Sequence, residues 1–157
     1  MFAIRLVQLI ETHADKLSEG LISQLKNADE CSDLLSKVPA HELKHRTYEI
    51  YSHLSDWLLS KTLSELEERY IGLGSRRARQ GVPFSQVMFA FHATKQNLWD
   101  YLWQEGLLEP EDLIREMELL RSLNQFFDRA LYYAAIGHEQ LWKAEMEASA
   151  QHAVTHR

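Results

Sequence analysis

The chain has 157 residues, 45% of them hydrophobic and 25% charged, which is the composition of one globular domain that can bury a core. Its formal net charge of −6 argues against broad binding to nucleic acid or to anionic membranes, since both need a basic surface. A single cysteine excludes an intrachain disulfide, and the lack of a long apolar run predicts a cytoplasmic protein with no membrane insertion.

Helical spacing of apolar residues begins at the N-terminus of the chain. The first predicted helix covers about residues 2 to 27, with Gly20 as the point where it can bend or divide. A connection with one helical turn follows over residues 28 to 39. Pro39 suits a helix start, so the second helix is predicted at about residues 40 to 59.

The third predicted helix, at about residues 62 to 80, has signals at both of its ends. Thr62 or Ser64 can cap its first turn, and Gly81 suits the position just after its last turn. Pro83 then opens the next helix.

Two glycines, Gly72 and Gly74, lie inside this third helix and each costs about 1 kcal/mol relative to alanine. We expect the close approach of a neighbouring helix to compensate for both of them.

The last two helices space their apolar residues in alternating steps of four and three. The fourth covers about residues 83 to 104, and the fifth begins after Pro110 and exceeds 30 residues. No β-type alternation is present. The predicted fold class is all-α: a single-domain bundle of about five helices over residues 1–157, with a long C-terminal helix. Its core spans about residues 3–145, and the tail from about 146 to 157 can fray.

The segment from His41 to His45 reads HELKH and matches the H-E-x-x-H spacing of zinc metalloproteases. On a helix, this spacing brings two histidines to one metal, with the glutamate beside a metal-bound water. Here the pattern lies in the first turn after Pro39, and Lys44 and Arg46 add positive charge beside the supposed cation. The usual third-ligand continuation is missing. We therefore predict a solvated helix start, no catalytic residue and no enzyme.

A wider polar stripe on the same helix keeps an alternative open. Its members are four residues apart: His41, His45, Glu49 and His53. Such a stripe could bind a transition metal, although it is more often the solvated face of an amphipathic helix. Four further polar residues interrupt or border the apolar stripes of the last two helices: His92, Lys95, Asn124 and His138. We predict satisfied polar insertions there, with a haem ligand as the alternative, so the leading prediction has neither metal nor cofactor.

Arginines gather at the end of the third helix, and aromatic residues gather in the last two helices. The arginines suit a helix C-terminus with carboxylate partners, and their alternative role is to bind an anion or an acidic partner. There are more aromatic residues than one helix–helix interface can bury, which favours an exposed face for a partner or a ligand cavity. The predicted contact residues are Arg76, Arg77, Phe91, His92, Trp99, Trp103 and Phe127.

The stretch RYIGLGSRRARQGVPFSQVMFAFHATKQNLWDYL resembles the N-terminal domain of RsbRD-type proteins, the bacterial RsbT co-antagonists, and related domains of bacterial sensor kinases. The shared features are a glycine-containing helix that ends in arginines, a QGVP turn, and an aromatic helix that ends in Leu98 and Trp99. The phrase FFDRALYYAAIGHE, over residues 126–139, is also similar, and the resemblance covers about residues 5 to 142. It implies a helical, non-enzymatic input domain in bacterial signalling that is often dimeric, with no metal role for HELKH.

The leading prediction is therefore a regulatory module that acts by protein–protein contact, with a small ligand or a partner as its signal. We expect a homodimer and a signalling protein partner in trans, with the long last helix passing the signal on. The alternatives are a metal- or haem-binding protein, and a purely structural oligomerisation domain.

Overall fold

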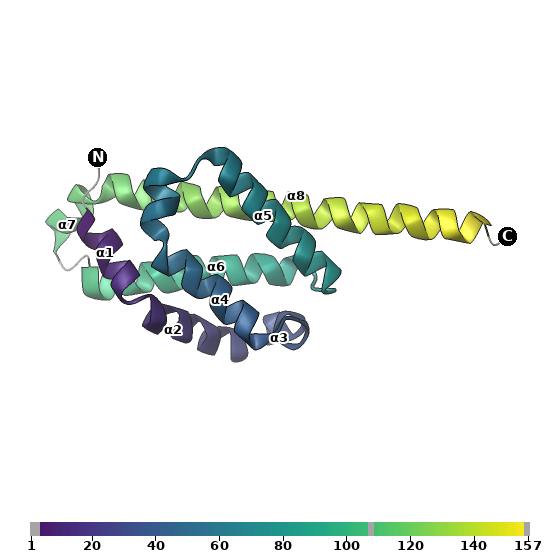
Figure 1. Cartoon of the computed structure of the whole chain (residues 1–157). Helices are drawn as coiled ribbons and strands as arrows, with labels where there is room; N and C mark the ends of the chain where they lie inside the picture. Colours follow the sequence, from purple (N-terminus) through teal and green to yellow (C-terminus); the bar gives the residue numbers. More distant parts are fainter. Residues whose placement is uncertain (1–3, 107–108, 156–157) are drawn as a thin grey trace.

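A computed structural model describes residues 4–106 and 109–155, and this part of the chain contains helices and no strand (Figure 1). The predicted all-α fold class with a long C-terminal helix is confirmed. Three short segments are 3₁₀-helical (η1) or π-helical (η2 and η3). In chain order, the elements are α1 (Ile4–Thr12), α2 (Ala14–Lys26), η1 (Asp29–Cys31), α3 (Ser32–Lys37), α4 (Ala40–Ser52), η2 (Asp56–Ser60), α5 (Leu63–Arg79), α6 (Phe84–Tyr101), η3 (Leu102–Gly106), α7 (Pro110–Arg115) and α8 (Met117–Thr155).

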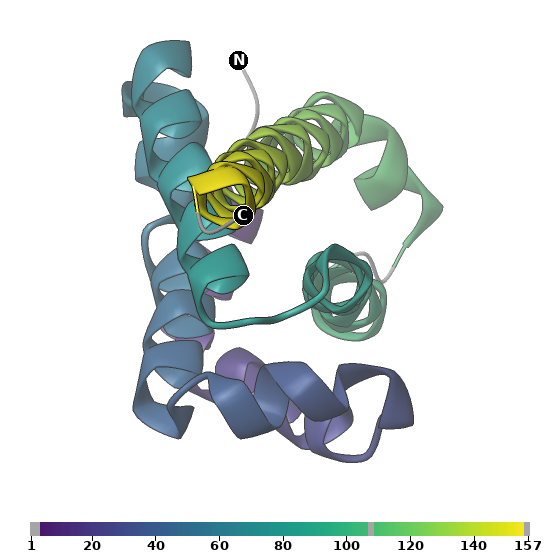
Figure 2. The ribbon, with the colours of Figure 1, turned by 90° about the vertical axis from the view of Figure 1, so that its right-hand side faces the viewer.

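The helices form layers beneath α8, which is the longest of the described elements. Helix α5 packs mainly against α8, and α2 packs against α4 and α6. Viewed along α8, the helices α4 and α5 form one side of the molecule, α6 lies opposite them, and α2 and α3 close the bottom (Figure 2). The distal part of α8 extends past all of these elements and ends at Thr155. The bundle thus holds one half of α8 and leaves the other half outside.

The predicted helix over residues 2–27 divides at His13, and the predicted division at Gly20 is wrong. The backbone of His13 leaves helical geometry, and its ring Nδ1 lies 2.9 Å from the carbonyl oxygen of Leu9. The backbone N–H of His13 also donates to the Leu9 carbonyl oxygen, at 3.2 Å, so the ring and the backbone of His13 share this acceptor. Gly20 remains inside α2, with its missing side chain near Asn97 of α6.

The second predicted helix is also shorter than expected. Helix α4 ends at Ser52, a turn follows at His53, and the chain continues as the π-helical η2. This change places Trp57 against two core aromatics, since its ring centroid lies 6.1 Å from those of Tyr70 and Phe126. The irregular segment thus carries Trp57 into an aromatic cluster with Tyr70 of α5 and Phe126 of α8, and aromatic pairs at such distances attract each other.

A buried hydrogen-bond network fastens α4 to α6 and α2. The hydroxyl of Tyr51 donates to the carbonyl oxygen of Thr94 at 2.9 Å, and burial raises the pKa of this phenol. The side-chain amide of Asn97 donates to the carbonyl oxygen of Leu17 at 2.9 Å and reaches the Tyr51 hydroxyl at 3.3 Å. The buried Tyr51 hydroxyl therefore has hydrogen-bond partners, as buried polar groups in proteins usually do.

The crossing of α5 and α8 depends on two glycines. A Cβ atom at Gly74 would lie 1.9 Å from the carbonyl oxygen of Ala134, and one at Gly137 would lie 2.0 Å from that of Ile71. The Ser75 hydroxyl donates to the Gly137 carbonyl at 3.1 Å. The predicted close approach is confirmed at Gly74 and is wrong at Gly72, where a Cβ would meet nothing within 4 Å.

The start of α5 is capped by Thr62 and not by Ser64. The Glu65 backbone N–H donates to the Thr62 hydroxyl at 3.2 Å, and the Glu65 carboxylate accepts from the Thr62 backbone N–H at 2.7 Å, which is a capping box. We expect Thr62→Ala to lower the free energy of unfolding by about 1 kcal/mol in urea denaturation. Ser64→Ala is the matched control and should leave it within about 0.5 kcal/mol; equal losses in both variants would contradict this cap assignment.

Candidate functional site

The arginines at the end of α5 converge on one carboxylate of α4. Glu42 accepts from Arg76 Nε at 2.5 Å and from its Nη2 at 2.8 Å, and it accepts from Arg77 Nη1 at 2.8 Å. Arg77 is buried and also donates to the side-chain oxygen of Gln80 at 2.8 Å. We call these four residues the Glu42 cluster. The hydrogen bond from Arg76 is the main reason why the pKa of Glu42 falls from 4.5 to about 2, against the opposing effect of burial.

The Glu42 cluster gives the HELKH segment a structural role. In a zinc peptidase, the central glutamate must face the metal-bound water, whereas Glu42 is held by two guanidinium groups. The flanking His41 and His45 are exposed. Across residues 4–106 and 109–155, no group of three or more His, Cys, Asp or Glu side chains is arranged to hold a metal ion.

The remaining members of the histidine stripe have carboxylates close to them. His45 Nε2 lies 3.6 Å from Glu49, and His53 Nδ1 lies 3.6 Å from Asp56. Glu49 in turn forms an ion pair with Arg69 of α5. The stripe is thus divided among separate local pairs along α4 and its C-terminal turn.

The predicted contact residues fall in four places. Arg76 and Arg77 belong to the Glu42 cluster, and Phe91 and Phe127 are buried in the aromatic core. His92 and Trp99 line one polar cleft between α6 and α8, together with Phe89, Lys95 and Asn124. Trp103 is 62% exposed on η3. The structure therefore does not bring the seven predicted contact residues together in one site.

His138 is a satisfied polar insertion, as its position in the apolar stripe predicts. Its Nε2 lies 2.8 Å from the carbonyl oxygen of Val82, in the turn between α5 and α6. Its ring packs against Phe84, with 5.5 Å between the ring centroids. This histidine therefore ties α8 to the start of α6.

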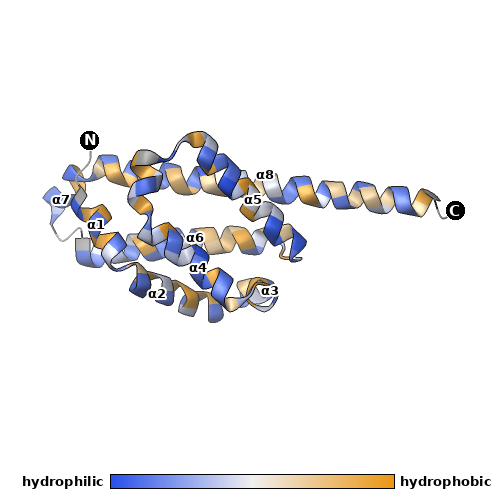
Figure 3. Cartoon of the chain, viewed as in Figure 1, coloured by the Kyte–Doolittle hydropathy of each residue, from blue (hydrophilic) through white to orange (hydrophobic). Residues whose placement is uncertain are grey.

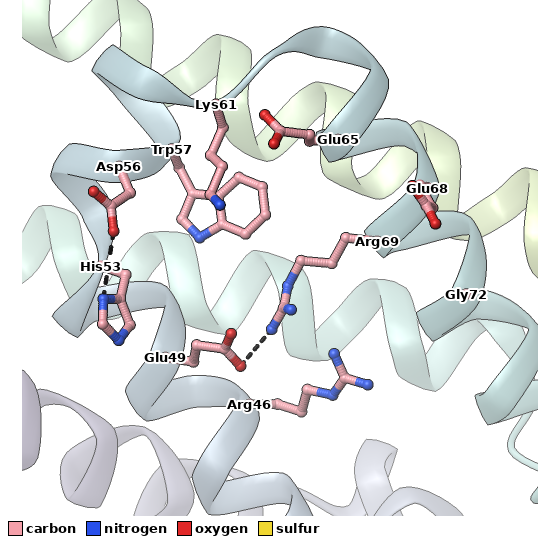
Figure 4. A pocket seen from close by; sticks show the side chains of 10 residues that line it. All are labelled: Arg46, Glu49, His53, Asp56, Trp57, Lys61, Glu65, Glu68, Arg69 and Gly72. Carbon is pink, nitrogen blue, oxygen red and sulfur yellow. Dashed lines mark ion pairs between the residues drawn. The ribbon is translucent and has the colours of Figure 1, made fainter.

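A cleft of about 700 Å³ lies between the α4–η2 segment and α5, and we call it the α4–α5 cleft (Figure 4). Its lining includes Arg46, Glu49, Trp57, Lys61, Arg69 and Gly72. The Trp57 ring is flanked by two cations, with Lys61 Nζ at 5.7 Å and the Arg69 guanidinium carbon at 5.4 Å from its centroid. These cation–π contacts hold both basic side chains at the cleft.

Sequence reasoning did not find this cleft. The sequence indicates Arg46 only as a charge that disfavours a metal beside HELKH. The helical spacing of Arg46 and Glu49 places both on the same side of α4, which is a signal in the sequence. The ion pair of Glu49 with Arg69, which lies 20 residues later in the chain, depends on how α5 folds back.

A second exposed feature is the distal half of α8. The side chains described from Trp142 to Val154 are all exposed, and three of them are large and apolar: Trp142, Met146 and Val154. Figure 3 shows orange, hydrophobic residues alternating with blue ones along this projecting segment. An amphipathic helix that packs against no other element of its chain usually packs against a partner.

Comparison with known proteins identifies a family but no individual relative. No curated protein and no solved structure matches the chain. Within the described residues, none of the helices is both long and apolar enough to cross a membrane. The family model for the N-terminal domain of the RsbT co-antagonist protein RsbRD, a signalling and regulatory domain, matches residues 14–153. The chain therefore belongs to the RsbRD N-terminal domain family.

Proposed function

We propose that this domain is a non-enzymatic input module that works in the bacterial cytoplasm. It receives its signal, a small ligand or a partner, on the helical bundle, and α8 passes the signal to a signalling protein partner. Membership of the RsbRD N-terminal domain family supports the signalling class. The observation that carries the mechanism is the course of α8, which packs against α5 over one half and projects from the bundle over the other.

We further propose that two copies associate through the projecting half of α8. Trp142, Met146, Ser149 and Ala153 follow one another in steps of four, three and four, so they share one face of the helix. Trp142 and Met146 are 58% and 54% exposed, so this face is free to pack against its counterpart in a second copy. Lysine and glutamate at other positions keep the remaining faces polar.

Sedimentation equilibrium tests this association. The wild-type chain is expected to be a dimer, and Met146→Glu is expected to raise its dissociation constant about a hundredfold, because a carboxylate would be buried in the seam. The midpoint of thermal unfolding of the monomer should not change, since Met146 is not part of the core. Ala144→Glu adds the same charge on the opposite face of the helix and should remain dimeric. A monomeric wild-type chain, or equal dissociation in both variants, would overturn the proposed seam.

A further inference from the structure

Arg46 has an unusual position for an arginine. It lies half-buried at one end of the α4–α5 cleft, and its guanidinium lies on the same side as that of Arg69 (Figure 4). It forms no hydrogen bond or ion pair with any residue in the described part of the chain. Its two basic neighbours differ in this respect, because Arg69 is paired with Glu49 and Arg77 is paired with Glu42.

The arginines beside Arg46 outnumber the carboxylates that pair with them. Four guanidinium groups, those of Arg46, Arg69, Arg76 and Arg77, share two carboxylates, those of Glu42 and Glu49. Burial, followed by repulsion from Arg69 and Arg77, lowers the pKa of Arg46. Glu49 and Glu42 offset part of this effect. Arginine stays protonated in proteins, so an anion bound beside Arg46 would stabilise this cation further.

The cleft has the size and the walls of a small-molecule site. Its volume of about 700 Å³ falls in the usual range for ligand pockets, which is about 300–1,000 Å³. Trp57 provides an aromatic wall, and Gly72 leaves the facing side of α5 open because it has no side chain. The donors of Arg46 face this space beside the Arg69 guanidinium, which is paired with Glu49.

We propose that the α4–α5 cleft binds a small molecule through its carboxylate or phosphate group, with Arg46 as the main anchor and Arg69 as the second. Asp56, Glu65 and Glu68 line other parts of the cleft, and they disfavour a large acidic partner such as nucleic acid. The site deepens the proposed function, on which it rests for its role as the sensory input. The binding itself does not depend on that role.

Isothermal titration calorimetry at low ionic strength tests the site with two probes, inorganic phosphate and acetate. At least one of them is expected to bind saturably at one site per chain, and the tighter one identifies the oxyanion group that the cleft prefers. Arg46→Gln should weaken that binding about tenfold or more, because it removes a charged donor pair. Lys44→Gln removes a charge from the outer surface of the same helix and should bind as the wild type does.

A second variant makes the test independent of how well Arg46→Gln folds. Gly72→Glu introduces a carboxylate where a Cβ meets nothing within 4 Å, so the fold should tolerate it while the new side chain competes for Arg46. We expect this variant to lose phosphate and acetate binding. No saturable binding of either anion by the wild-type chain, or unchanged affinity in both variants, would overturn the proposal. Binding by the Met146→Glu monomer would separate the anion site from the dimer, so that either proposal can fail alone.

Discussion

Gly74→Ala should lower the free energy of unfolding by about 3 kcal/mol, whereas Gly72→Ala, two residues away, should raise it by about 0.5–1 kcal/mol. The first change puts a methyl group within 1.9 Å of the Ala134 carbonyl oxygen, which is backbone and cannot rotate away. The second puts the same group into open space, so only the gain in helix propensity remains. Gly137→Ala meets the Ile71 carbonyl and should behave as Gly74→Ala does.

Urea denaturation of the three alanine variants, each followed by circular dichroism, measures these differences directly. Gly72→Ala is the matched control, because it changes the same residue type in the same helix. A loss of less than about 1 kcal/mol at Gly74 would mean that α5 and α8 separate easily. In that case the crossing would not be a fixed point of the fold.

Glu42→Gln should cost about 3 kcal/mol of unfolding free energy at neutral pH, because it leaves the buried Arg77 without a carboxylate partner. Glutamine keeps the size of the side chain and can still accept one hydrogen bond, so the loss comes from the charge. Glu68→Gln, on the same pair of facing helices, is the control. Glu68 is exposed, so Glu68→Gln should change the free energy of unfolding by no more than about 0.5 kcal/mol in the same urea titration.

The effect of Glu42 should also depend on pH in one direction. The pKa of Glu42 is about 2 in the folded chain, below its ordinary value of 4.5. The contribution of the Glu42 charge to the free energy of unfolding is therefore complete above pH 4.5, and it is lost as the pH falls from there toward 2. The difference in unfolding free energy between the wild type and Glu42→Gln should narrow over this interval. A difference in unfolding free energy that stays constant with pH would show that the Glu42 charge does not cause it.

Much of the helical architecture could be predicted from single positions. Thr62, Gly81 and Pro83 mark the ends of α5 and the start of α6 through local backbone chemistry, and Gly81 does adopt a positive φ of 77°. The interruptions at His13 and His53 could not be predicted, because neither residue is a strong helix breaker. A side-chain contact of His13 with the Leu9 carbonyl accompanies the first, and the packing of Trp57 on Tyr70 accompanies the second.

The candidate sites were less predictable for a physical reason. The sequence shows that arginines need carboxylates, but it does not show which carboxylate. In the sequence, Glu42 is part of a metal-binding pattern, whereas its hydrogen-bond partners in the structure are 34 and 35 residues away on α5. Arg46 could not be recognised as an arginine without an ion pair among the described residues until those pairings were known, because Glu42 and Glu49 are paired with other arginines.

The position of the α5–α8 crossing along α8 has a geometric consequence. Ala134 is 17 residues from Met117, and Gly137 is 18 residues from Thr155, so the contact divides the helix into two arms of nearly equal length. At about 1.5 Å per residue, each arm is about 26 Å long. The glycine contacts fit only one register, because sliding α8 along α5 would put a residue with a Cβ atom in the place of Gly137. The crossing therefore fixes how much of α8 lies outside the bundle, and with it the distance from the bundle to the end of the outer arm.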